Sequence, residues 1–184
     1  MRYLLVFMLL LISACSNNPT KFILAPQAFA PQNQALSQTR FNLQLVDSRA
    51  MPYTLKVMNG NKSFQLKTSN DLLSHLKTTI TQALTEQGAA INSSNDYQVK
   101  IQIAQLQALV QQNTLDHTVT NQVAFIINVQ TAAGAFTKTY SGDGNYTGPF
   151  TIDVAAVERE LRLLTEQVLS QLLQDSSWQH FLRS

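Results

Sequence analysis

The sequence is short of cysteine and of charge, and each shortage excludes a class of protein. Cys15 is the single cysteine, so the chain cannot form an internal disulfide. Lysine and arginine together number 13, against 11 acidic residues. This balance excludes an electrostatic grip on nucleic acid or on anionic lipid, and we expect no nucleic-acid partner. Amide side chains take the place of charge, with 20 glutamines and 13 asparagines.

Long apolar runs are also missing, apart from one near the start. The stretch from Tyr3 to Ile12 is about ten residues long, whereas a helix needs about 20 apolar residues to cross a bilayer core. It follows the positive start Met1-Arg2 and ends in Ser13-Ala14-Cys15, the pattern of a bacterial lipoprotein signal. We therefore predict that residues 1–14 are a signal peptide and that Cys15 is the site of lipid attachment.

Lipid on Cys15 predicts where the protein resides. The expected chemistry is diacylation of the Cys15 thiol, cleavage before this residue, and acylation of the new amine. Two or three acyl chains meet the requirement for stable anchoring, since a single chain binds a membrane only reversibly. Ser16 follows the cysteine, and by the sorting rule of Gram-negative lipoproteins a serine there favours the outer membrane. We expect a protein anchored in the outer membrane that faces the periplasm.

Motifs for catalysis and metal binding are missing as well. His75, His117 and His180 are far apart and lack a spacing such as His-x-x-x-His, so we interpret them as solvated. No G-x-S-x-G elbow occurs. The segment Ser141–Asn145 lacks the lysine of a phosphate loop and the carboxylates of a calcium loop. We expect no enzyme activity, no cofactor and no metal.

The chain divides into a tether and one domain. Residues 15–40 contain Pro19, Pro26 and Pro31 and are predicted to form a lipidated tether. Within it, residues 21–25 are too apolar for a spacer, and we expect them to pair as an edge strand or to pack on the domain. Residues 41–184 are expected to form a single domain.

Alternating and helical periodicities predict the elements of this domain. Asn59-Gly60 predicts a hairpin, a change of apolar phase predicts a bulge near Ala104 or Gln105, and Asp153 is the expected cap of the last long helix. The predicted strands cover 41–45, 53–58, 62–67, 97–110, 119–129 and 136–141, and the predicted long helices cover 72–84 and 154–172. The order predicts an α+β fold, with a mostly antiparallel sheet of about five or six strands and two long helices packed on one face.

Two polar groups are candidates for a binding rim. Asp47 and Arg49 end the first strand, where they form either a local turn with an ion pair or a polar rim beside a groove between the sheet and the N-terminal segment. Asp143 and Asn145 lie in the glycine-rich segment 141–145, which predicts a turn or, alternatively, a loop at the edge of a binding site.

Two further groups could meet a protein partner. Glu158 and Glu160 flank Arg159 on the outer face of the last long helix, as a solvated face or a docking patch. Terminal apolar residues either cover the core or form a dimer patch, which leaves a homodimer as an open alternative; they are Trp178, Phe181 and Leu182.

The order of several short segments resembles the YajG family of lipoproteins, a set of uncharacterised Gram-negative envelope proteins. The resemblance runs from the cleavage site to the C-terminus, and the order of the segments carries it rather than any single motif. The segments are Asp47-Ser48-Arg49, Ser69–Leu72 with Gly88, Val99–Ile103, Ala124–Ile127, Lys138-Thr139-Tyr140, and Gln174-Asp175 to Phe181-Leu182. The resemblance implies an outer-membrane lipoprotein with no assigned activity and no catalytic residues to carry over.

Three functions remain open on the sequence. The first is a non-catalytic, lipid-anchored interaction or accessory module that binds an unidentified envelope protein through a sheet edge or a helix face. The second is a binder or sensor of a small apolar or cell-wall ligand in a groove between the sheet and the helices. An enzyme is a distant third.

Overall fold

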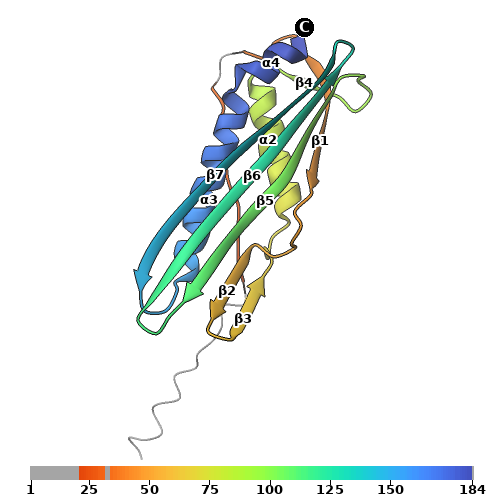
Figure 1. Cartoon of the computed structure of the whole chain (residues 1–184). Coiled ribbons are helices and arrows are strands. Elements are labelled where there is room, and N and C mark those ends of the chain that lie inside the picture. Colours follow the sequence, from red (N-terminus) through yellow and green to blue (C-terminus); the bar gives the residue numbers. More distant parts are fainter. Residues whose placement is uncertain (1–20, 32–33, 184) are drawn as a thin grey trace, which may run out of the picture.

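Three long strands lie side by side in the middle of the molecule (Figure 1). The computed structural model describes residues 21–31 and 34–183, so the predicted signal peptide, Cys15 and Ser16 lie outside the described residues. The elements are β1 (Arg40–Asp47), β2 (Leu55–Asn59), β3 (Lys62–Leu66), α2 (Leu72–Glu86), β4 (Ala90–Ile91), β5 (Gln98–Gln112), β6 (Asp116–Thr131), β7 (Gly134–Pro149), α3 (Val154–Gln174) and α4 (Ser176–Arg183).

The sheet has seven strands and is mixed, which corrects the expectation of a mostly antiparallel sheet of five or six strands. β6 runs antiparallel to the whole of β5, and β7 runs antiparallel to β6. On the other side of β5, β1 pairs with its first half and β2 with its second half, both in parallel. The chain passes from β1 to β2 without reversing, so both strands share the direction of β5. The two-residue strand β4 was too short to predict.

The predicted Asn59-Gly60 turn and the predicted bulge are confirmed. Asn59 pairs with Lys62 across the β2–β3 turn, and Gly60 has a φ of 55°. The register of β5 against β6 shifts between Ile103 and Gln105. This bulge changes the alternation, so that the apolar residues before and after it face the same core.

The glycine-rich segment of β7 is strand, so the expected turn or loop over 141–145 is wrong. β7 pairs with β6 without a register shift from Gly134 to Pro149. Glycine is required here because neighbours approach closely. A Cβ on Gly142 would lie 2.9 Å from Leu164 Cδ1, and one on Gly148 would lie 2.6 Å from His117 Cε1.

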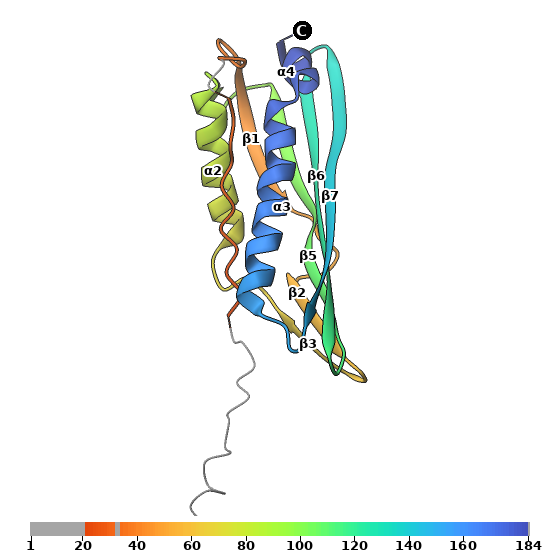
Figure 2. The same ribbon diagram turned by 90° about the vertical axis from the view of Figure 1, so that its left-hand side faces the viewer.

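The two long helices pack on one face of the sheet, as predicted (Figure 2). Asp153 caps α3 and accepts a hydrogen bond from the Ala155 N–H at 3.0 Å. Asp71 caps α2 and accepts a hydrogen bond from the Ser74 N–H at 3.0 Å. Among the described residues, no helix has both the length and the apolar character needed to cross a membrane.

The C-terminal helix α4 closes the upper end of the core. The Trp178 side chain is fully buried, and its indole Nε1 donates to the Leu172 carbonyl at 2.8 Å. Leu182 is buried, and Phe181 packs against Phe136 with ring centroids 5.7 Å apart. Trp178 and Leu182 therefore cover the core, which was one of the two predicted alternatives.

Residues 21–31, which we call the strap, lie extended between α2 and α3 (Figure 2). The strap forms no strand, so of the two expectations for 21–25 the packed one holds. Phe22 and Leu24 are fully buried. Side chains take the place of a neighbouring strand: Asn70 Nδ2, just before α2, donates to the Leu24 carbonyl at 2.8 Å, and Glu158 Oε1 of α3 accepts from the Ile23 N–H at 2.6 Å. The buried part of the chain thus starts well before Phe41.

Candidate binding cleft

A cleft of about 550 Å³ lies between α3 and the inner side of β6 and β7. Its strand side comes from β6 and β7, and its helix side comes from the exposed stripe of α3. The lining residues are Asn121, Asp143, Gly144, Asn145, Tyr146, Ala156, Arg159, Glu160, Leu163, Leu164 and Gln167. The volume falls in the range of about 300–1,000 Å³ that is usual for ligand pockets.

Two buried polar atoms in this cleft have no hydrogen-bond partner among the described residues. They are the Asn121 Oδ1 and the Tyr146 hydroxyl. Asn121 is only 3% exposed, although buried polar groups in native proteins are nearly always hydrogen-bonded. Burial, with Glu160 and Asp153 nearby, raises the pKa of Tyr146. The phenol therefore stays protonated and can donate, while the Asn121 oxygen can accept.

Glycine spacing in β7 keeps the cleft open. A Cβ on Gly144 would meet no atom within 4 Å, whereas one on Gly142 would meet both Leu164 and Val168. The helix therefore contacts the strand at Gly142 and stands away from it at Gly144. The difference creates room directly beside the two unsatisfied atoms.

The rim of the cleft carries both charge signs and one exposed apolar residue. Arg159 Nη2 forms an ion pair with Glu160 Oε1 at 2.8 Å, and Asp143 and Asn145 are exposed on β7. Leu163 is a large apolar side chain left exposed on α3. Glu160 and Arg159 thus belong to the cleft, whereas Glu158 is directed to the strap.

β7 is also an edge strand, because within the described residues it pairs only with β6. The outer edge of such a strand presents backbone N–H and C=O groups that can pair with another chain. The strand is 16 residues long and has no bulge. The cleft therefore combines an open strand edge with a helix that runs beside it.

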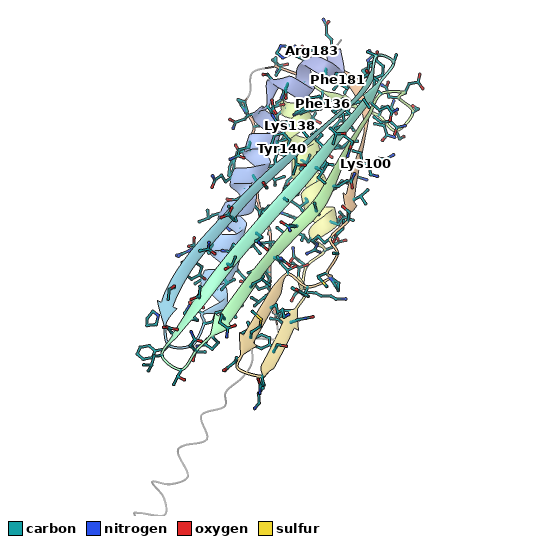
Figure 3. The ribbon with its side chains drawn as sticks, in the orientation of Figure 1. Lys100, Phe136, Lys138, Tyr140, Phe181 and Arg183 are labelled. Carbon is teal, nitrogen blue, oxygen red and sulfur yellow. The ribbon has the colours of Figure 1, made fainter. Side chains whose placement is uncertain are left out.

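A second hollow of about 520 Å³ continues along the same two elements. Figure 3 shows Lys138 and Tyr140 next to each other on β7. Both contact Asp175 at the end of α3, where the Tyr140 hydroxyl donates to Asp175 Oδ2 at 2.6 Å and Lys138 forms an ion pair. Burial raises the pKa of Asp175, but hydrogen bonds from Lys138, Tyr140 and Ser177 outweigh it and hold the pKa below its ordinary value.

Asp47 and Arg49 do not belong to this cleft. They form a local ion pair, with Arg49 Nη2 2.7 Å from Asp47 Oδ2, and the Arg49 N–H donates to Asp47 Oδ1 at 3.2 Å. Hydrogen bonding from Arg49 lowers the pKa of Asp47. Arg49 also donates to Thr54 Oγ1 and lines a separate hollow of about 210 Å³. The geometry matches the local turn, and the two halves of the predicted rim lie on different strands, β1 and β7.

The histidines lie on three different elements, and His117 corrects the expectation of a solvated side chain. His117 is buried in β6, and its Nδ1 donates to the Phe150 carbonyl at 3.0 Å. His75 Nε2 contacts the Pro26 carbonyl of the strap at 2.9 Å. In the described part of the chain, no group of three metal-ligating side chains comes together.

Comparison with known proteins identifies the family. A family model described as an uncharacterized lipoprotein matches residues 26–183. The chain belongs to this lipoprotein family. The membership confirms the resemblance drawn from the order of segments in the sequence. No curated protein matches the sequence of this lipoprotein.

Solved structures show which fold this lipoprotein shares. A Xanthomonas campestris protein of the DUF330 family is 17% identical, with a TM-score of 0.52, and the match covers 88% of this chain and 95% of that one. A minor lipoprotein from Acinetobacter baumannii is 12% identical, with a TM-score of 0.41 and coverage of 73% and 87%. At 17% identity the first match shows a common fold only.

Sequence reasoning found the rim of the cleft in this lipoprotein but missed its base. Asp143 and Asn145 line the cleft, as part of a strand rather than of a loop. Asn121 and Tyr146 were not singled out. A signal for Asn121 was present, because it interrupts the apolar alternation of Val119 and Val123 at an inward-facing position.

Proposed function

We propose that this lipoprotein is a non-catalytic interaction module of the cell envelope. It is held at the outer membrane by lipid on Cys15, faces the periplasm, and binds an extended segment of another envelope protein in the cleft between α3 and β7. Membership in a lipoprotein family supports the anchor, and Ser16 supports the outer membrane.

The unsatisfied polar atoms of the cleft carry the proposal. Asn121 Oδ1 is a buried acceptor and the Tyr146 hydroxyl a buried donor, and each lacks a partner. An unpaired buried polar group costs about 1–3 kcal/mol. Both atoms are covered in the free protein, so a partner recovers that cost by displacing the side chains that cover them and pairing with both. The open edge of β7 adds backbone groups to the same surface.

An extended peptide segment fits this surface better than a globular partner. Strand addition to a sheet edge takes affinity from backbone hydrogen bonds and specificity from pockets for alternate side chains. Here β7 supplies the edge, and the space beside Gly144 supplies such a pocket. The wall of α3 offers Leu163 and Gln167 to the far side of the segment.

The charges in the cleft support binding rather than catalysis. Glu160 is engaged by Arg159, and the raised pKa of Tyr146 keeps its hydroxyl protonated. A protonated Tyr146 does not act as a base near neutral pH. The polar groups are suited to holding a partner in place.

Photo-crosslinking in intact cells tests the proposal. The crosslinker p-benzoylphenylalanine is placed at Asn145 on β7, at Gln167 on α3, and at the exposed Gln65 on β3 as a control. We expect the same protein adduct from positions 145 and 167, which face one cleft, and no such adduct from position 65.

A pair of matched variants ties the adduct to the cleft. Gly144→Leu adds a side chain where space is free, whereas Thr147→Leu adds the same bulk at an exposed position of β7 outside the cleft. The adduct should disappear in Gly144→Leu and persist in Thr147→Leu. Adducts that differ between positions 145 and 167, or that survive Gly144→Leu, would contradict the proposal.

A small ligand in the same cleft is the second candidate. The volume of about 550 Å³ and the unsatisfied atoms at its base favour a small polar molecule, such as a cell-wall fragment, over an apolar one. Native mass spectrometry of the lipidated protein decides, because a bound fragment adds a defined mass that Gly144→Leu should remove. Spectra with no added mass would exclude this candidate.

A further inference from the structure

The strap enters the fold at one end of the molecule. Lys21 is six residues beyond Cys15, and six residues of extended chain span at most about 20 Å. The Ile23 N–H donates to Glu158, in the second turn of α3, so the strap begins beside the start of that helix. Lipid on Cys15 therefore keeps this end of the domain within about 20 Å of the bilayer.

Among the described residues, the two most exposed large apolar side chains lie at the same end. Leu115 in the β5–β6 turn is 73% exposed, and Phe150 at the end of β7 is 69% exposed. The Phe150 N–H donates to the Leu115 carbonyl at 2.7 Å, so the two residues are adjacent. Figures 1 and 2 place the β5–β6 turn, the end of β7 and the start of α3 together at the lower end of the molecule. We call Leu115 and Phe150 the apolar tip.

Phe150 is held in this position against the preference of its backbone. Its φ of 56° lies in the left-handed region, which a bulky residue rarely adopts. Three hydrogen bonds hold it there: its carbonyl accepts from Gln112 Nε2 at 2.9 Å and from His117 Nδ1 at 3.0 Å, and its N–H pairs with Leu115. A strained residue persists only where the surrounding structure imposes it. Here the imposed conformation leaves a phenyl ring in solvent.

From this placement we infer that the apolar tip inserts into the surface of the bilayer that carries the lipid anchor. The inference rests on the proposed lipid on Cys15 and adds a second membrane contact to it. Apolar side chains at the headgroup boundary are stabilised by leaving water, and two membrane signals together hold a protein more firmly than one. The tip would also fix the orientation of the domain relative to the bilayer. The strand β7 would then extend away from the membrane, and the cleft would open parallel to the membrane surface.

A depth-sensitive label tests this contact in the full lipidated chain. Acylated Cys15 has no free thiol, so a new cysteine is the single labelling site. The fluorophore NBD is attached at Thr114→Cys, beside the tip, or at Ala133→Cys, in the turn at the other end of β6. The 16 residues of β6 separate the two turns by about 50 Å. The protein is reconstituted into vesicles of phosphatidylethanolamine and phosphatidylglycerol that contain spin-labelled lipid.

The expected result is quenching of the label at position 114 that is several-fold stronger than at position 133. The same label is then read in a Leu115→Ser, Phe150→Asn background, because asparagine tolerates the left-handed conformation and keeps the turn folded. Circular dichroism checks that the fold is intact. Quenching at position 114 should fall to the level of position 133.

Each other outcome overturns the inference. If the protein floats with the vesicles but position 114 is quenched no more than position 133, the anchor stands and the tip does not touch lipid. If quenching at 114 survives in the double variant, the apolar side chains are not responsible. If the wild-type protein does not float with the vesicles, the proposed anchor itself fails, and the tip contact fails with it.

Discussion

The helix α3 borders two grooves, and they differ in what fills them. On one side, between α3 and α2, the strap lies extended, with Phe22 and Leu24 buried. On the other side, between α3 and β7, the groove is open along a length that includes the cleft and the hollow near Asp175. One helix therefore supports an occupied and an open groove in the same fold.

The occupied groove shows how this protein holds an extended segment. Glu158 and Glu166 of α3 accept backbone N–H groups of the strap at 2.6 and 3.0 Å, and Asn70, two residues before α2, both donates to and accepts from Leu24. In the open groove the corresponding atoms, Asn121 Oδ1 and the Tyr146 hydroxyl, have no partner in the described part of the chain. The comparison teaches that side chains can replace a neighbouring strand, and it suggests what the open groove is built to hold.

Truncating a strap side chain in the occupied groove should cause the largest change in the free energy of unfolding. Phe22→Ala removes a fully buried aromatic side chain, and such a change costs about 3–5 kcal/mol. We expect this loss in the free energy of unfolding measured with urea. Ile23→Ala, at a neighbouring exposed position, is the control and should cost much less. Equal losses for the two variants would mean that the strap adds little to the core.

A substitution at the base of the open groove should instead raise the free energy of unfolding. Asn121→Leu replaces a buried oxygen that lacks a partner with an apolar side chain of similar size, which should stabilise the fold by about 1–3 kcal/mol. Urea unfolding measures the gain, and the crosslinked adduct from position 145 should weaken in parallel. A loss of stability would indicate that Asn121 is already satisfied in the free protein.

The far end of the open groove should give the smallest effect, and one that depends on pH. Hydrogen bonds from Lys138, Tyr140 and Ser177 outweigh burial and hold the folded pKa of Asp175 below its ordinary value of 3.8. Its contribution is therefore complete above that value and is lost as the pH falls. Asp175→Asn should cost about 1 kcal/mol near neutral pH.

Unfolding curves at several pH values check this prediction. The difference between wild type and Asp175→Asn should stay constant above about pH 5 and shrink below pH 4, where the unfolded carboxyl takes up its proton. A difference that grows on acidification would contradict the assignment.

Local patterns predicted much of the fold, and pairing between distant segments explains what they missed. Three predicted features depend on neighbours in sequence, and each is present: the apolar side of α3, the Asn59-Gly60 turn and the bulge near Ala104. The parallel pairing of β1 and β2 with β5 depends on the path of the chain through the whole sheet. No local periodicity encodes that path.

The candidate site was predicted only at its rim for a similar reason. Asp143 and Asn145 stand out in the sequence because Gly142 and Gly144 surround them, but Gly142 serves close packing against Leu164, and Gly144 leaves open space beside the strand. The base of the cleft consists of Asn121 and Tyr146, which lie opposite α3. Their position depends on how the helix packs across the strands, so the sequence carries no more than the break in apolar alternation at Asn121.

The strap also sets the route by which mechanical force would enter the protein. In a chain anchored by lipid on Cys15, tension between the membrane and the envelope reaches the domain first at Lys21. The strap continues from there along α2 and α3 (Figure 2). A pull along its length therefore acts in shear on its hydrogen bonds to Asn70, Glu158 and Glu166, and it strains all of them at the same time. A tail attached at the surface would instead peel away one contact at a time. With lipid on Cys15, as proposed, the strap would connect the core to the anchor, and a load on the membrane would bear on the helices before it reached the sheet.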